Sequence, residues 1–375
     1  MRIAIVHRFF WRPGAVPAVA RGWADHLEAA GHQVVVLASD VDPAASTERR
    51  TYVRAALPHG KPFDLAGWVF AAGVLAALLR RRPRPHAILC TDSTAYFGAW
   101  LAGRLLRAPA IMAFQGWVYS PGKRRVYPRT VAWMYKLSLH FAARCAPLVG
   151  CLNRQIRDGL RALGTPPRRL WYAPNCVDLE LWRCEKHGAH QRDRRQVLYV
   201  GGFREEKGIG VLAEAVPLVA RRLPDARFRI LGGEEPEDGP VHRRLAEAEA
   251  LASVDFGGLV TREALGEAYA EADVLAVPSL AEGHPLAPLE CLACGTPVVA
   301  TAIPGLDETI EDGANGLLVP PGDAQALADA LCRVLGDPAL LDRLSRAARP
   351  SVERFDWAAR VRELERRIEA LRRGA

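Results

Sequence analysis

Two cations, Arg204 and Lys207, follow a pair of glycines in the segment Val-Gly-Gly-Phe-Arg-Glu-Glu-Lys-Gly, residues 200–208. Glycine lets a backbone approach a ligand closely, and a helix beginning after Lys207 would offer free N–H groups to an anion. The segment has the spacing of neither a dinucleotide-binding motif nor a P-loop, so it predicts neither NAD nor ATP binding. From these residues alone, a turn that binds a diphosphate and a turn that is simply solvated both remain open.

Two carboxylates, Glu282 and Glu290, are eight positions apart after an apolar run at 274–277. One would lie in a loop at the end of a strand and the other about a turn into the following helix. Such carboxylates suit hydrogen bonds to sugar or ribose hydroxyls, and the N–H groups of Leu286 and Ala287 could meet a phosphate. The alternative is that the two acidic residues only stabilise the positive end of the helix dipole.

Taken together, these segments resemble the retaining glycosyltransferases of family 4, which have the GT-B fold. The Glu-x7-Glu signature of that family corresponds to residues 282–290, and its Arg/Lys phosphate clamp to residues 204–207. Residues 173–178, 256–260 and 315–323 agree as well. The resemblance covers essentially the whole chain and is more specific in the second half.

The resemblance implies roles for individual residues. Arg204 and Lys207 would hold the diphosphate of the donor and stabilise the leaving group. Glu282 would hold the donor sugar near the reacting carbon, and Glu290 the ribose hydroxyls. The other donor-binding residues implied in this way are Gly14, Ala15, Gln115, Gly202, Leu259, Val260, His284, Leu286 and Ala287.

The positions in the first half depart from the family pattern. The family commonly has Gly-Gly where this chain has Gly14-Ala15, which would approach the diphosphate from the other domain. It often has a histidine where this chain has Gln115, and a glycine where it has Cys176. Gln115 can hydrogen-bond a hydroxyl but cannot carry a proton at neutral pH, so the donor sugar stays open. Residues 259–260 would flank the nucleotide base.

The resemblance implies transfer of a sugar, with retention, from a nucleotide-diphosphate-sugar to an acceptor hydroxyl. A UDP- or GDP-sugar is the expected donor. Because Arg204 and Lys207 would stabilise the charge that develops on the leaving group, we expect no metal and no cofactor. Asp40-Val41-Asp42 spells the metal-binding motif of the other glycosyltransferase fold, but it follows the second strand of a different architecture.

The elements that position these residues form a βαβ pattern, so we expect an α/β protein with two facing Rossmann-like domains. We expect the domains at 1–185, which would bind the acceptor, and 194–355, which would bind the nucleotide-sugar. A polar stretch at 184–194 would link them. A helix at 356–375 would lie outside the second sheet and pack back toward the first domain. The expected strands are 3–7, 34–38, 87–90, 110–114, 148–152, 196–200, 227–232, 254–256, 274–277, 297–300 and 316–319, and the expected helices include 18–30, 208–223 and 357–373.

Composition supports a soluble protein of two domains. The chain has 375 residues, half of them hydrophobic, with a net charge of +8, which excludes disorder and collagen-like repeats. Residues 1–190 hold 27 Lys and Arg against 11 Asp and Glu, whereas residues 191–375 hold 23 against 31. No zinc-finger spacing, basic leucine zipper or RNP-like segment accompanies the basic half, so we expect no nucleic-acid partner.

The basic half also points to the acceptor. Fifteen uncharged residues, 65–79, are too few to span a bilayer and are followed by the basic run 80–84. They are either a buried helix or a helix on an anionic membrane surface. With the basic residues at 123–125 and 129, they favour a phosphate-bearing or lipid-linked saccharide acceptor and a cytoplasmic protein peripheral to the inner face of the membrane. A soluble natural-product acceptor remains an alternative.

The eight cysteines lie mostly in apolar stretches and no secretory signal precedes them, so we expect free thiols. For the pair Cys291-x-x-Cys294, packing in the core is favoured over metal binding. Two further functions compete with glycosyl transfer: a nucleotide-sugar epimerase of similar architecture and a non-catalytic nucleotide-sugar-binding protein. An NAD-dependent oxidoreductase is disfavoured because the dinucleotide motif is absent.

Overall fold

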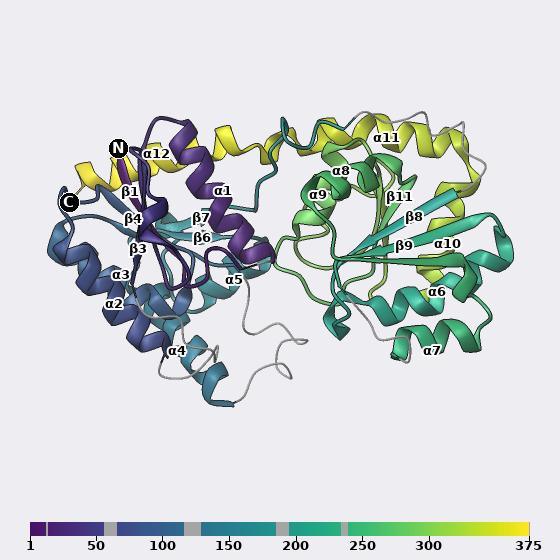
Figure 1. The fold of residues 1–375 in the computed structure, drawn as a ribbon, viewed down its shortest axis with the longest axis horizontal. Helices are drawn as coiled ribbons and strands as arrows, with labels where there is room; N and C mark the ends of the chain where they lie inside the picture. Colours follow the sequence, from purple (N-terminus) through teal and green to yellow (C-terminus); the bar gives the residue numbers. More distant parts are fainter. Residues whose placement is uncertain (13, 56–65, 116–128, 185–194, 234–238, 375) are drawn as a thin grey trace. The chain divides into compact units, whose positions relative to one another are not determined.

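The computed structural model describes residues 1–12, 14–55, 66–115, 129–184, 195–233 and 239–374. The basic run at 123–125 and most of the expected linker lie outside these ranges. The chain divides into two compact units (Figure 1). Unit 1 comprises Met1–Cys176 together with Trp357–Ala375, and unit 2 comprises Val177–Asp356. The division therefore falls before the expected boundary at residue 185, and the C-terminal helix belongs to unit 1.

Unit 1 contains a seven-stranded sheet in the order β3-β2-β1-β4-β5-β6-β7. Every neighbouring pair is parallel. The strands are β1 (Arg2–Val6), β2 (Gln33–Ala38), β3 (Arg50–Arg54), β4 (Ala87–Cys90), β5 (Ala110–Ala113), β6 (Val149–Cys151) and β7 (Leu170–Tyr172). Strands β1, β4, β5 and β6 are short and mostly apolar, as expected of strands buried on both faces.

Helices cover both faces of this sheet, with α2, α3 and α4 on one face and α1 and α12 on the other (Figure 1). Phe70, Val74 and Leu78 recur every four residues along α2 and are buried against the sheet. On the other face, Trp357 of α12 packs against Trp23 of α1, with ring centroids 5.1 Å apart. The helices are α1 (Ala15–Ala29), α2 (Ala66–Arg80), α3 (Tyr96–Leu106), α4 (Arg129–Cys145), α5 (Arg154–Ala162) and α12 (Trp357–Arg373).

Unit 2 contains a six-stranded parallel sheet in the order β10-β9-β8-β11-β12-β13. One core lies between the sheet and α6, α7 and α10, and a second lies on the opposite face beneath α8 and α9. The strands are β8 (Arg195–Val200), β9 (Ala226–Leu231), β10 (Val254–Gly258), β11 (Val274–Val277), β12 (Val298–Thr301) and β13 (Gly316–Val319). The helices are α6 (Ile209–Arg222), α7 (Pro240–Glu247), α8 (Arg262–Glu271), α9 (Leu286–Ala293), α10 (Ala324–Gly336) and α11 (Pro338–Val352).

Every strand expected from the sequence is confirmed, with ends that differ by at most two residues. Two strands were not expected, β3 and β7, and they are the two edges of the first sheet. Edge strands are commonly short or charged, which weakens the apolar pattern that identifies a strand. Accordingly β3 begins and ends with arginine, and β7 has three residues.

The cysteines differ from the expectation at one pair. Cys184 and Cys294 form a disulfide within unit 2, so the prediction of free thiols is wrong for these two residues. They are 110 positions apart, and folding brings their Cα atoms to 4.8 Å, a spacing that only the tertiary structure sets. Six cysteines are free, and Cys291 is buried in the core as expected. No helix in the described ranges is long and apolar enough to cross a membrane.

Candidate active site

The candidate site in unit 2 lies at the carboxyl ends of two neighbouring strands. Strands β8 and β11 pair directly in the parallel sheet, so the turns that follow them emerge side by side. The first turn is the glycine-rich segment 201–208, and the second is 278–285. The N–H groups of Leu280 and Ala281 both donate to the carbonyl of Glu206, so hydrogen bonds join the two turns. Ligands of parallel α/β sheets bind at this end of the strands.

Lys207 and Glu282 meet between these turns. The Lys207 ammonium lies 2.7 Å from Glu282 Oε1, and the Ser279 hydroxyl donates to the same oxygen over 2.8 Å. The Glu282 side chain is 10% exposed and that of Lys207 is 24% exposed. The Thr301 hydroxyl in turn donates to the Ser279 carbonyl over 2.5 Å. The site therefore holds a cation and a carboxylate in fixed positions, each with one side toward solvent.

Arg204 is held less tightly than Lys207. Its side chain is 65% exposed and forms an ion pair of 3.0 Å with Glu206. Arg204 is the N-cap of the single 3₁₀ turn Glu205–Lys207 and Lys207 is its last residue, so both cations lie in the segment that leads into α6. An exposed guanidinium that has a carboxylate partner can exchange it for a phosphate with little loss of packing.

Two glycines shape the first turn. Gly208 has φ +68°, and a Cβ there would lie 1.8 Å from the carbonyl oxygen of Pro278. This close approach lets the turn after β8 contact the turn after β11. Gly202 has open space around its Cα, and its carbonyl accepts a hydrogen bond of 3.0 Å from the Tyr199 hydroxyl. Burial, and then the charge of Glu282, raise the pKa of Tyr199, so this hydroxyl remains a donor.

The second carboxylate lies on α9. Tyr269 donates to Glu290 Oε2 over 3.0 Å. Burial raises the pKa of Glu290 to about 7, against the opposing effects of the Tyr269 hydrogen bond and of Arg262. Leu286 and Ala287 are the first two residues of α9, where backbone N–H groups have no partner within a helix. This end of α9 therefore offers free N–H donors, and Glu290 lies about one turn further along the same helix.

Three other predicted residues of unit 2 take different positions. The His284 side chain is buried, and its Nε2 lies 3.1 Å from Thr309 Oγ1, so it supports the loop from within. Leu259 follows β10 and is 72% exposed, whereas its neighbour Val260 packs against the second core. An exposed leucine at the carboxyl end of a strand is available to a ligand, such as a base.

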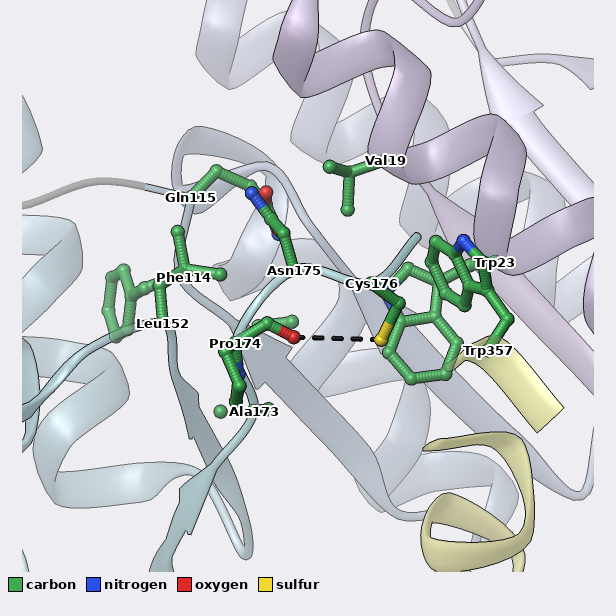
Figure 2. Close-up of a pocket in the computed structure, with 12 residues that line it drawn as sticks. Val19, Trp23, Phe114, Gln115, Leu152, Ala173, Pro174, Asn175, Cys176 and Trp357 are labelled. Carbon is green, nitrogen blue, oxygen red and sulfur yellow. Dashed lines mark hydrogen bonds between the residues drawn. The ribbon is translucent and has the colours of Figure 1, made fainter. Parts of the chain in front are cut away.

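The remaining predicted residues belong to unit 1. Gly14 has φ +126° and precedes α1, of which Ala15 is the first residue. Gln115 follows β5 and lines a pocket with room for about one water molecule (Figure 2). Figure 2 shows Gln115 and Asn175 near Val19. The pocket is also lined by Ala113, Phe114, Gly150, Leu152, Trp23, Ala173, Pro174, Cys176 and Trp357.

Sequence reasoning missed this pocket and the supporting residues of unit 2. The pocket collects side chains from α1, α12 and the ends of three strands, so no local motif marks it. Tyr269, which donates to Glu290, likewise lies in α8 and away from either motif. Ser279 was part of the recognised segment, but its bond to Glu282 was not foreseen.

The Asp40-Val41-Asp42 segment has a structural role in unit 1. Asp40 accepts the backbone N–H groups of Phe10 and Trp11, at 2.6 and 2.9 Å. Asp42 caps a 3₁₀ turn by accepting from the Ala44 N–H over 3.0 Å. Within the described ranges, no cluster of three or more His, Cys, Asp or Glu side chains has an arrangement that could hold a metal.

Comparison with known proteins identifies the family. Residues 14–176 match the family model described as a glycosyl transferase 4-like domain, and residues 194–337 match glycosyl transferases group 1. The alpha-D-kanosaminyltransferase of Streptomyces kanamyceticus is 30% identical over 316 residues, which is 77% of this chain and 81% of that protein. The glycogen synthase of Mycobacterium tuberculosis is 28% identical over 88% of this chain and 85% of its own. The chain belongs to the group 1 glycosyltransferases and is a glycosyltransferase.

Solved structures identify the fold. Sucrose-phosphate synthase from Thermosynechococcus elongatus has a TM-score of 0.82 at 24% identity, with complete coverage of both chains. Anabaena HepE, solved in complex with UDP-glucose, has a TM-score of 0.79 at 18% identity and covers 99% of this chain and 100% of its own. The GT-B fold expected from the sequence is thereby confirmed.

Proposed function

We propose that this glycosyltransferase transfers a sugar from a nucleotide-diphosphate-sugar to an acceptor hydroxyl, with retention at the anomeric carbon. The observation that carries the proposal is the contact between Lys207 and Glu282 at the ends of adjacent strands, with Arg204 at the start of the same turn and α9 following the second turn. A diphosphate needs fixed cations and N–H donors, and a sugar needs a carboxylate that accepts from its hydroxyls. The site supplies all three within unit 2.

The proposed reaction breaks the bond between the anomeric carbon and the β-phosphate oxygen. The acceptor oxygen attacks from the same face as the departing phosphate, and its proton passes to the phosphate oxygen that leaves. Negative charge develops on that oxygen, where Lys207 and Arg204 would stabilise it. Glu282, already held by Lys207 and Ser279, would accept from hydroxyls of the donor sugar.

We propose that transfer needs no metal and no cofactor, because the two cations supply the positive charge that the leaving group requires. Ribose hydroxyls would donate to Glu290, and the N–H groups of Leu286 and Ala287 would bind the phosphate. Leu259 and Val260 would flank the base. Donor contacts from Gly202, His284, Gly14, Ala15 and Gln115 stay predictions.

The proposed donor is a UDP- or GDP-sugar, and the complex of HepE with UDP-glucose supports the UDP-sugar. For the acceptor, the excess of arginine in the first half favours a phosphate-bearing or lipid-linked saccharide at an anionic membrane surface, and hence a peripheral cytoplasmic enzyme of polysaccharide assembly. A soluble natural product stays the alternative acceptor class.

The first test is a thermal-shift panel with UDP, GDP, ADP, dTDP and NAD on the parent protein and on Lys207→Ala. A ligand at about 100 times its dissociation constant stabilises by roughly 2.7 kcal/mol, which is readily seen. One diphosphate should raise the midpoint of the parent and not that of Lys207→Ala. Arg222→Ala, which removes a cation paired with Asp329 at the other end of α6, should respond like the parent.

The panel also separates the alternatives. The proposal is contradicted if NAD alone raises the thermal midpoint, or if none of the nucleoside diphosphates raises it. Once the donor is known, an NMR assay with acceptor extracts reads the anomeric configuration of the product. Epimerised donor without any acceptor would identify an epimerase, and binding without turnover over all acceptor classes would identify a non-catalytic binding protein.

A further inference from the structure

Large apolar side chains are exposed on the helices that cover one face of the unit 1 sheet. Trp133 on α4 is 63% exposed, Leu105 on α3 is 59% exposed, and Trp68 and Val69 on α2 are 45% and 55% exposed. Phe97 and Leu137 are each 43% exposed. We call these six residues the apolar face. Single exposed apolar residues are common, but a contiguous group on one side of a domain indicates an interaction surface.

The members of the apolar face are connected through ring contacts. Trp68 on α2 contacts Phe97 on α3, with ring centroids 6.4 Å apart. Phe97 contacts Phe141 on α4 at 5.3 Å. Leu137 precedes Phe141 by one helical turn, and Trp133 precedes it by two. The apolar face therefore extends across α2, α3 and α4, which lie side by side (Figure 1).

The unit 1 core does not need these side chains. The opposite sides of the same helices supply the core, through Phe70 and Val74 on α2, Tyr96 and Ala99 on α3, and Leu139 on α4. The fold leaves these six side chains largely exposed, so a surface that covers the apolar face would bury them.

The charged residues of the segment that carries the apolar face are almost all positive. Residues 66–145, which contain all three helices, hold 12 Lys and Arg and a single acidic residue, Asp92. The Asp92 carboxylate accepts from the Thr94 N–H and hydroxyl, which caps the turn before α3. The exposed cations described on or next to these helices are Arg80, Arg82, Arg84, Arg104, Arg107, Lys136 and Arg144.

We propose that the apolar face binds the surface of an anionic lipid bilayer, with its rings at the level of the headgroups and the surrounding cations against lipid phosphates. Tryptophan and phenylalanine favour this depth, and each nearby Lys or Arg adds attraction to anionic lipid. Membrane binding of this kind would bring the enzyme to a lipid-linked acceptor, so the inference rests on the proposed function with that acceptor.

A second copy of the chain fits this surface less well. Pairing two apolar faces would bring two basic rims together, and like charges in contact are unfavourable. An anionic bilayer satisfies the rings and the cations at once. A basic rim also disfavours a basic protein partner.

The test is co-flotation with vesicles of phosphatidylcholine alone and of phosphatidylcholine with phosphatidylglycerol. We expect the parent to bind the anionic vesicles at least about tenfold more tightly than the neutral ones. Trp133→Ser/Leu137→Ser should weaken binding to anionic vesicles by about tenfold or more. Arg104→Ser/Arg107→Ser should weaken binding to anionic vesicles on the order of tenfold and leave binding to neutral vesicles unchanged.

Matched controls address non-specific stickiness. Leu181→Ser/Leu251→Ser removes two leucines of unit 2 that are 48% and 37% exposed, and it should bind vesicles like the parent. All the replaced residues are exposed, so the variants should fold, which their thermal midpoints verify. Parent-like vesicle binding by the apolar-face variants, or no binding by the parent, overturns the proposal. Concentration-dependent dimers that Trp133→Ser/Leu137→Ser abolishes, without vesicle binding, would assign the surface to a second copy instead.

The two proposals fail separately. The nucleotide shift of the parent should persist in the apolar-face variants, and Lys207→Ala should still bind anionic vesicles. Loss of vesicle binding with an intact nucleotide shift contradicts the membrane surface only. An absent nucleotide shift with intact vesicle binding contradicts the proposed function only.

Discussion

At the scale of single residues, each proposed phosphate-binding cation already has a carboxylate partner. Arg204 pairs with Glu206 near solvent, whereas Lys207 pairs with a largely buried Glu282. The two cations therefore differ in what their loss leaves behind. Removing Arg204 exposes nothing new, but removing Lys207 leaves Glu282 partly buried without its counter-charge.

We predict different phenotypes for the two substitutions. Arg204→Ala should keep the thermal midpoint of the free protein and weaken nucleotide binding by roughly ten- to a hundredfold, the value of a hydrogen bond to a charged group. Lys207→Ala should weaken binding similarly and also lower the midpoint. The double variant Lys207→Ala/Glu282→Gln should recover the midpoint but not the binding. Equal midpoints for all three variants would contradict a structural role for the Lys207–Glu282 pair.

We predict that donor binding depends on pH, because the pKa of the Glu290 carboxyl is raised. Its pKa of about 7 in the free protein means that the carboxyl is mostly protonated below pH 7 and ionised above it. Ribose hydroxyls donate best to the ionised form, so donor affinity should rise with pH up to about 7 and level off above. Below that pKa the loss should approach about tenfold per pH unit. Calorimetric titration with an intact nucleotide-sugar measures this, because its diphosphate does not titrate in the range.

Glu290→Gln is the matched control for the pH dependence. It keeps the size of the side chain and removes its charge, so donor affinity should be weak and nearly independent of pH. A parent whose donor affinity does not change between about pH 6 and 8 would rule out ionisation of Glu290 as the cause.

At the scale of elements, Gly208 sets how closely the two active-site turns approach. Gly208→Ala places a methyl group against the Pro278 carbonyl and a side chain in the left-handed region. We expect a loss of roughly 2 kcal/mol or more in the free energy of unfolding, and weaker nucleotide binding because the turns separate. Urea denaturation measures the stability. Gly336→Ala, in the last turn of α10 with open space around it, should be neutral or slightly stabilising.

At the scale of the whole molecule, the two units have separate cores, so they should unfold in separate steps. Trp357→Ala removes a buried ring that contacts Trp23 and His26 of α1. It should lower the free energy of unfolding of unit 1 by about 3 kcal/mol or more. In calorimetry the transition of unit 1 should move to a lower temperature, and the transition of unit 2 should not move. Trp182→Ala, which removes a buried ring of unit 2, should do the reverse.

The nucleotide provides the complementary test of the two units. If its contacts lie mainly in unit 2, a nucleoside diphosphate should raise the unit 2 transition and leave the unit 1 transition in place. A single transition that moves as a whole under both substitutions would show that the units unfold together.

The sequence by itself determined the class of fold and the location of the candidate site. Strands buried on both faces must be short apolar runs, and turns that bind phosphate need glycine beside cations, so both leave a local pattern. This is why strands such as β4 and β11 were predicted to the residue. Segments 201–208 and 282–290 were identified together through their resemblance to the family pattern, since the residues of each segment alone left a solvated turn or a capped helix open. Edge strands β3 and β7 lack that pattern because solvent tolerates their charged or short sequences.

Only the tertiary structure decided which distant groups meet. Glu282 lies 75 positions from Lys207, Tyr269 lies 21 from Glu290, and Cys184 lies 110 from Cys294. The tertiary structure also decided that Trp68, Phe97 and Trp133 are exposed on one face. An apolar residue reads alike in a sequence whether it faces the core or solvent. Which of the two applies depends on how neighbouring helices pack, and that is a property of the folded chain.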